Sequence, residues 1–338
     1  MPVREIKLDS VFDATSQPEP MRIFDLQFTQ NAQQLVVVGG FDGRFGGKTI
    51  KRRNLICLNT SDWSEVWAVK EARKEPPHAV ALLESCGRLL ATSSHGEATI
   101  RDLATGEVVM TLPEQLMRDV ASCGWERFIG CGSHQGRHWV ALYEGRSGEQ
   151  AGEWLVGHGV VKTPRKVIAT DSGERAFALI SVISGHKSIT GEIVVLQTPQ
   201  LVPLVAIAVP FDPLQAALLP DDRLVVLGRF RERCFLSLVD IATAQVGATV
   251  SLKKAEVRRV TYVQRLQQVV LLRKDMILEF RDPCELNLIA RSAPLLEGEE
   301  DHGGWGLAIH ADGLLAVGDF GSMFSGGGFA VFGLPETL

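Results

Sequence analysis

Residues 78–112, HAVALLESCGRLLATSSHGEATIRDLATGEVVMTL, contain four short apolar runs that polar turns separate. The first two runs flank the turn ESCG, and the last two flank ATG. Short runs rich in β-branched residues between Gly, Ser and Asp are typical of strands. Strands joined by such brief turns form antiparallel hairpins. The stretch therefore predicts a four-stranded antiparallel sheet.

The same order of runs recurs along the chain. Second strands are expected at LVVVGG (35–40), LLATSS (89–94), RFIGCGS (127–133), FALISVI (177–183), LVVLGRF (224–230) and LLAVGDFGS (314–322). First strands are expected near Ile23, His78, Arg118, Arg165, Leu214, Val257 and Trp305. Their mean spacing of about 47 residues is typical of propeller blades.

We therefore expect an all-β chain that forms a single domain over residues 1–338, a seven-bladed β-propeller of four-stranded antiparallel blades. The expected blades span roughly 22–72, 73–115, 116–158, 159–210, 211–253, 254–298, and 299–338 together with 3–14. The last unit supplies three strands, whereas the N-terminal segment REIKLDSVFD (4–13) belongs to no complete blade. We expect this segment to close the last blade, which would leave no open sheet edge in the ring.

Three units resemble WD-repeat blades. GEATIRDLATGEVV (96–109) is similar to that family's third strand, turn and fourth strand, with Arg101-Asp102 where Trp-Asp is usual. HGGWGLAIHADGLLAVGDFGS (302–322) resembles the opening two strands, and Val239-Asp240 occupies the dipeptide position in the fifth unit. The family's buried His–Ser–Asp–Trp network is incomplete in every unit. The resemblance implies a divergent WD-repeat or quinoprotein-like propeller that serves as a scaffold in multiprotein assemblies.

Two segments leave an alternative open. VRRVTYVQRLQQVVLLRKDMILEF (257–280) has apolar residues at helical spacing and could form an amphipathic helix. Its Val, Tyr and Ile content and its repeating neighbours favour strands. A short helix is also possible near Pro113–Val120.

Composition places limits on compartment and chemistry. The chain has 338 residues, 45% of them hydrophobic, and a net charge of -5. No apolar run reaches the roughly 18–20 residues that span a bilayer. Charges at Arg4, Glu5, Lys7 and Asp9 interrupt the start, where a signal peptide would need an apolar core. We therefore expect a cytoplasmic protein. We also expect its thiols to be free and buried, because the six cysteines show no C-x-x-C pairing.

Motifs that suggest catalysis or cofactors have simpler explanations. GGFDGRFGGKT (39–49) ends like a phosphate-binding loop, but its spacing is wrong and a strand, not a helix, is expected after it. His134 and His138 fall in a hairpin, where a four-residue spacing loses its meaning for metal binding. The acidic run GEEDHGGW (298–305) lacks the alternating oxygen ligands of a calcium loop. We expect no cofactor, no metal and no catalytic residue.

Charge is expected to divide between the two faces of the ring. Connections from fourth to first strands and from second to third strands share one face. The formal charges of the loops on this face sum to roughly +9, and those on the other face sum to about -4. Basic residues flank Phe41 and Phe45 in the insertion 41–54. The candidate binding residues are Arg44, Lys48, Lys51, Arg52, Arg53, Lys162, Arg165, Arg229, Arg231 and Arg233.

The leading expectation is a non-catalytic platform that binds an acidic protein partner through this basic face. The alternative is a small-molecule enzyme of lyase or hydrolase type at the channel mouth, with His158, His186 and Asp319 as the residues to inspect. A third possibility is nucleic-acid contact through the basic face, against which the net charge of -5 counts. The oligomeric state is left open.

Overall fold

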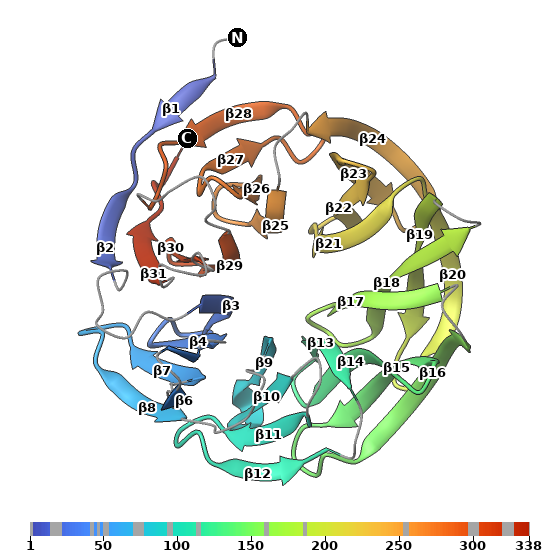
Figure 1. Cartoon of the computed structure of the whole chain (residues 1–338). Coiled ribbons are helices and arrows are strands. Elements are labelled where there is room, and N and C mark those ends of the chain that lie inside the picture. The colour runs from blue at the N-terminus through green and yellow to red at the C-terminus, as the bar shows by residue number, and fades with distance from the viewer. Residues whose placement is uncertain are drawn as a thin grey trace.

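Seven sheets are arranged in a closed ring in a computed structural model of the chain (Figure 1). The structure describes residues 3–13, 22–40, 44–45, 48–49, 54–69, 78–92, 97–112, 116–158, 162–184, 188–252, 257–296, 304–319 and 328–337. The prediction of a seven-bladed propeller with four-stranded blades is confirmed. No helix among these residues is long and apolar enough to cross a membrane.

Each blade begins at the channel and ends at the rim. Blade 1 contains β3 (Arg22–Phe28), β4 (Gln34–Gly40), β7 (Leu55–Asn59) and β8 (Glu65–Val69). Blade 2 contains β9 (Ala79–Leu83), β10 (Arg88–Thr92), β11 (Thr99–Asp102) and β12 (Val108–Thr111). Blade 3 contains β13 (Met117–Cys123), β14 (Arg127–His134), β15 (Arg137–Glu144) and β16 (Gln150–His158). Blade 4 contains β17 (Lys162–Ala169), β18 (Arg175–Ser184), β19 (Ser188–Gln197) and β20 (Val202–Val209).

The remaining blades follow the same order. Blade 5 contains β21 (Asp212–Leu218), β22 (Arg223–Phe230), β23 (Arg233–Asp240) and β24 (Gln245–Leu252). Blade 6 contains β25 (Val257–Val263), β26 (Gln268–Arg273), β27 (Leu278–Arg281) and β28 (Leu288–Ser292). Blade 7 contains β29 (Gly304–Ile309), β30 (Leu314–Asp319) and β31 (Phe329–Gly333). The small pair β5 (Arg44–Phe45) and β6 (Lys48–Thr49) lies in the insertion of blade 1.

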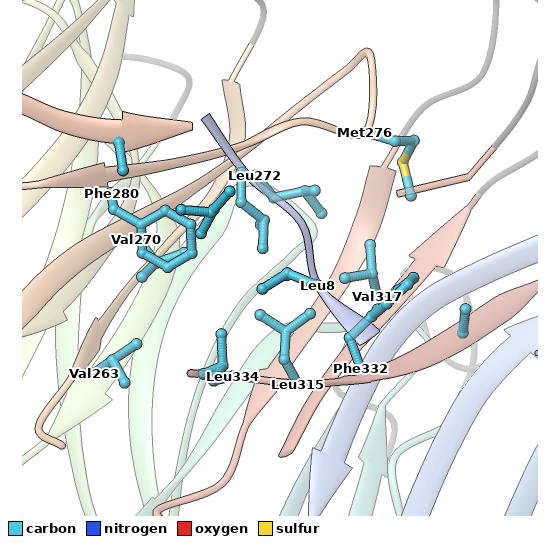
Figure 2. Close-up of a cluster of buried hydrophobic side chains, with 14 residues drawn as sticks. Leu8, Val263, Val270, Leu272, Met276, Phe280, Leu315, Val317, Phe332 and Leu334 are labelled. Carbon is cyan, nitrogen blue, oxygen red and sulfur yellow. The ribbon is translucent and has the colours of Figure 1, made fainter. Parts of the chain in front are cut away.

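The N-terminal segment joins two blades. Its second half, β2 (Asp9–Asp13), pairs antiparallel with β31 as the outermost strand of blade 7, which confirms the predicted closure. Its first half, β1 (Arg4–Ile6), pairs parallel with β28 and adds a fifth strand to blade 6. Ile6 and Leu8 are buried in the apolar cluster that those two blades share (Figure 2). This strap, residues 4–13, therefore bridges blades 6 and 7.

The core lies between neighbouring blades, because each sheet buries both faces. One cluster joins Ile129 and Cys131 of blade 3 to Ala178 and Ile180 of blade 4. All four side chains are fully shielded from solvent. Apolar burial on this scale is the main stabilising force in a protein of this size. It also explains why the second strands read as continuous apolar runs rather than alternating ones.

The segment 257–280 forms strands, as its composition favoured, and the amphipathic-helix alternative is wrong. The possible helix near Pro113–Val120 is also wrong where the structure describes that segment, because Met117–Val120 belong to strand β13. Residues 113–115 lie outside the described residues. The described part of the chain contains one helical turn, the 3-10 turn Glu84–Cys86 between β9 and β10.

An Arg-Asp pair ends the third strand of blades 2 and 6. Arg101 Nη1 donates to the carbonyl of Gly106 at 2.9 Å, and Arg281 Nη1 donates to the carbonyl of Leu286 at 2.8 Å. The following aspartate, Asp102 or Asp282, accepts two backbone N–H groups of the next turn. The buried arginine thus fixes the connection to the outer strand.

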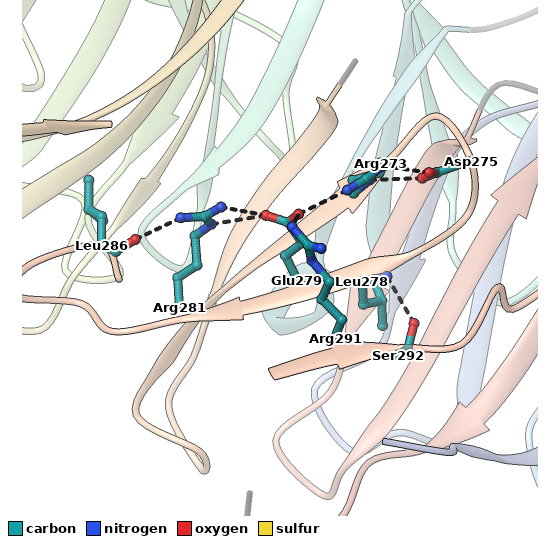
Figure 3. A network of polar contacts seen from close by, with 8 residues as sticks. All are labelled: Arg273, Asp275, Leu278, Glu279, Arg281, Leu286, Arg291 and Ser292. Carbon is teal, nitrogen blue, oxygen red and sulfur yellow. Dashed lines mark hydrogen bonds and ion pairs between the residues drawn. The ribbon is translucent and has the colours of Figure 1, made fainter. Parts of the chain in front are cut away.

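Blade 6 adds a buried carboxylate to this arrangement. Glu279 is 2% exposed and lies within 3.1 Å of Arg273, 2.6 Å of Arg281 and 3.0 Å of Arg291 (Figure 3). Burial raises the pKa of Glu279, but hydrogen bonds and charges from these arginines outweigh it, so its pKa lies below the ordinary value. The carboxylate is therefore ionised and joins three strands of one sheet.

Candidate functional site

The structure describes one face of the ring more completely than the other. We call the face that carries the fourth-to-first and second-to-third connections the loop face, and the opposite face the turn face. Every internal gap in the described residues falls on the loop face. The described connections there include the two-residue turns Gln135–Gly136 and Arg231–Glu232.

The insertion of blade 1 is described only in part. Arg44 and Lys48 lie on the strands of the β5–β6 hairpin. The side chains of these two residues, and all of Lys51, Arg52 and Arg53, lie outside the described residues. The next described element after the β5–β6 hairpin is strand β7, so the described residues of this segment contain no helix N-terminus that could face a phosphate.

Lys162 and Arg165 are held by carboxylates on neighbouring strands. Lys162 Nζ lies 2.6 Å from Glu192 Oε2 on β19 of the same blade. Arg165 Nε donates to Ser181 Oγ at 2.7 Å, and its Nη2 lies 3.9 Å from Asp212 Oδ2 of blade 5. Both cations are therefore partly neutralised, and Arg165 links two blades.

Three predicted residues meet at one hairpin tip. Arg229, Arg231 and Arg233 lie around the β22–β23 turn, and all three are exposed. The guanidinium of Arg231 lies over the ring of Phe230, 5.4 Å from its centroid. Within the described part of the chain, none of the three forms an ion pair with a carboxylate. The turn is short and its strands are fully paired, so these charges are displayed on a rigid support.

The channel contains charged residues that the sequence did not single out. Every inner strand except β9 has a β-bulge near its beginning within the described pairings. The residues directly after these bulges are Asp25, Asp119, Lys166, Gln215, Arg259 and Gly306. Because they share one register position, they form a ring at one level of the channel.

Two ion pairs in this ring connect blades. Lys166 Nζ lies 3.1 Å from Asp119 Oδ1, between blades 3 and 4. Arg259 Nη2 lies 3.9 Å from Asp25 Oδ1 and donates to the carbonyl of Phe24 at 2.7 Å, between blades 6 and 1. The two aspartates also accept backbone N–H groups of the next inner strand, from Val167 and Val80. Burial raises the pKa of Asp25 despite the opposing charges of Arg259 and Lys166.

A cavity of about 500 Å³ continues from this ring towards the turn face. Its polar lining includes Asp25, Gln27, Lys166, Arg259 and His310, and Leu307 and Ile309 contribute apolar surface. A signal for these residues exists in the sequence: Asp25, Lys166 and Arg259 follow the expected starts of their first strands, Ile23, Arg165 and Val257, by one or two positions. The sequence of a single blade does not show that these charged residues face a channel shared by all the blades.

Two of the residues considered for an enzyme lie on strands in different blades. His158 lies on β16, the outermost strand of blade 3, and Asp319 lies on β30 in blade 7, across the ring (Figure 1). His186 lies outside the described residues, as do the side chains of the other two. His134 and His138 flank a tight turn, with His138 buried. No group of three or more possible metal ligands occurs among the described residues, and residues 298–303 of the acidic run are not described.

Comparison with protein-family models finds no match, and no curated protein matches the chain. The propeller architecture therefore stands on the structure alone.

Proposed function

We propose that this protein is a non-catalytic interaction platform whose loop face binds an acidic surface of a protein partner. The observation that carries the proposal is the β22–β23 tip, where three exposed arginines have no carboxylate partner among the described residues. Guanidinium groups on a pre-ordered hairpin lose little side-chain freedom when they bind a carboxylate. The basic insertion at 44–53 would extend the same contact surface.

The proposal includes the resemblance to WD-repeat propellers and a cytoplasmic setting. A closed ring of paired strands supports many loops without large internal motions, which suits a scaffold. Fold alone does not decide function. The positive charge expected for the loop face supplies the chemical argument, because opposite charge on a partner speeds and orients association.

A charge-reversal experiment tests the proposal. We would label wild type, the triple variant R229E/R231E/R233E, and a second variant with Arg44, Lys48, Lys51, Arg52 and Arg53 changed to Glu. The control is R4E/R146E, which reverses two exposed charges, one on the outermost strand of blade 6 and one in a turn of the turn face. Cross-linking in a lysate followed by mass spectrometry would identify partners, and purified partners would then be titrated.

We expect wild type and control to capture the same acidic protein, and the loop-face variants to bind it at least tenfold more weakly. Association should slow more than dissociation speeds up, and added salt should reduce the difference. Equal binding by all four proteins, with equal thermal midpoints, would exclude the loop face as the contact surface.

A second candidate function is small-molecule binding in the channel. The cavity of about 500 Å³ falls within the size range of ligand pockets and combines apolar walls with a few charged groups. Native mass spectrometry of the purified protein should then detect a bound metabolite, which the cavity-filling variant Gln215→Trp should lose. A wild-type mass equal to that of the bare chain at micromolar metabolite concentrations would count against this candidate.

A further inference from the structure

The most exposed large apolar side chain among the described residues belongs to Trp125, at 63%. It lies on the turn face, in the turn between β13 and β14 of blade 3. The carbonyl of Trp125 accepts a hydrogen bond from Ser85 Oγ of blade 2. The turn of blade 4 lies so close that a β-carbon on Gly173 would be 2.8 Å from the Cα of Gly124. The backbone is thus held on both sides while the indole ring faces solvent.

A cavity of about 200 Å³ opens beside this ring, where the turns of four blades meet. Its lining includes Gln30 of blade 1, Glu84 of blade 2, Trp125 of blade 3 and Asp171 of blade 4. The volume is below the roughly 300–1,000 Å³ of pockets for drug-sized ligands. It equals the liquid volume of about seven water molecules, which suits one long side chain rather than a whole metabolite.

The charge beside Trp125 is negative. Glu84 and Asp171 both line the cavity, which has no basic side chain in its lining, and Glu126 follows the tryptophan directly. The surrounding turns are acidic as well. Counted without the flanking strand ends, those of the turn face carry Asp62, Glu84, Glu107, Glu126, Glu149, Asp171, Glu174, Asp221, Asp222, Asp282, Glu285, Asp312 and Glu336, against Arg146 and Arg265.

Arginines at the nearby strand ends do not neutralise this cavity, because they pair elsewhere. Arg127 lies 2.8 Å from Glu144, and Arg175 lies 2.7 Å from Asp222. The cavity therefore keeps two carboxylates beside an aromatic ring. A cation over an indole ring is attracted by its negative face, and nearby carboxylates strengthen the preference for a positive ligand.

The geometry points to a binding site for the side chain of a lysine or arginine on a basic segment of a partner protein. The alkyl stem of that residue would pack on Trp125, and its charged end would reach Glu84 and Asp171. Exposed tryptophans are frequent centres of binding energy in protein interfaces. The site lies on the face opposite the proposed loop-face contact, so either proposal can fail without the other.

Calorimetric titration with a defined probe tests the site. The probe is an acetylated and amidated (Gly-Arg)3 peptide, and (Gly-Glu)3 is its charge-reversed counterpart. The variants are Trp125→Ala, Asp171→Asn and Glu84→Gln, the last of which can still accept the hydrogen bond that Glu84 receives from the backbone of Gln30. Glu149→Gln is the matched control, since it removes an exposed carboxylate elsewhere on the turn face.

We expect wild type to bind the arginine probe and not the glutamate probe. Trp125→Ala should weaken binding about tenfold, and Asp171→Asn and Glu84→Gln about three- to tenfold each. Glu149→Gln and the loop-face variant R229E/R231E/R233E should remain within twofold of wild type. Thermal midpoints should match, because Trp125 is exposed.

Three results would overturn the inference. The first is no binding of the arginine probe by wild type, and the second is equal binding by Trp125→Ala. The third is concentration-dependent self-association of wild type, measured by sedimentation velocity and abolished by Trp125→Ala. That result would assign the site to a second copy of this chain.

Discussion

Glu279→Gln removes the carboxylate that Arg273, Arg281 and Arg291 share in blade 6, whereas Arg273 keeps Asp275 as a partner at 2.6 Å. The carboxylate is 2% exposed and Arg281 is 8% exposed, so both charges are shielded from water. Removing one partner of a buried ion pair typically costs about 3–5 kcal/mol, because the remaining charge stays buried without compensation. Glutamine keeps the size of the side chain, which confines the change to charge and hydrogen bonding.

The expected shift in thermal midpoint follows from the size of the chain. Unfolding entropy of about 2.1 cal/mol/K per residue gives roughly 0.7 kcal/mol/K for this chain. The loss of 3–5 kcal/mol then lowers the midpoint by about 4–7 °C. Circular dichroism at 218 nm measures it, and Glu285→Gln, an exposed change in the same blade, should shift it by less than about 1 °C.

The pH dependence provides a second measurement. The pKa of Glu279 is lowered in the folded state, so its stabilising effect is present above the unfolded pKa. This stabilising effect is lost as the pH falls through the lower pKa that Glu279 has in the folded state. The difference in midpoint between wild type and Glu279→Gln should therefore be constant near neutral pH and shrink below about pH 4.5. A midpoint for Glu279→Gln within 1 °C of wild type at pH 7 would refute the reasoning.

Other substitutions address the strap, the blade packing and the thiols. Ile6→Ala should cost about 2–3 kcal/mol in urea unfolding, because the strap loses its buried anchor; an unchanged midpoint would mean that the strap adds no stability. Gly228→Ala should cost about 1–3 kcal/mol, since a β-carbon there would overlap the ring of Phe211, whereas Gly333→Ala has open space and should be neutral. Cys284 is exposed and should react first with a thiol reagent, half-buried Cys86 more slowly, and the four buried cysteines only after unfolding; a fast phase that survives the double variant Cys284→Ser/Cys86→Ser would contradict this assignment.

The sequence predicts the ring because its signals are local. The first strand of blade 6 was expected at Val257 and begins there, and that of blade 2 was expected at His78 and begins at Ala79. Alternating apolar residues, turn residues and a regular repeat are all readable within about 50 residues. The buried charge network, the pairing of the strap and the exposed tryptophan depend instead on contacts between segments that are far apart in the sequence.

Glu279 illustrates this limit. Its strand, Leu278–Arg281, alternates apolar and charged residues, which indicates a shared face for the glutamate and Arg281. The pattern does not show that Arg273 and Arg291 join from both neighbouring strands. Similarly, β1 has three residues, too few to predict parallel pairing with β28. The exposure of Trp125 depends on how turns of neighbouring blades meet, for which no spacing rule exists.

The strap of residues 4–13 also affects the order of events while the chain is being made. Its strands leave the ribosome well before β28 and β31, with which they pair. At about 5–20 residues per second, the interval is roughly 15–60 s. During that time Ile6 and Leu8 have no blades 6 and 7 to cover them. Nascent chains are thus exposed to mispairing until blade 7 emerges, and a chaperone that shields residues 4–13 would have to act while blades 1 to 6 are made.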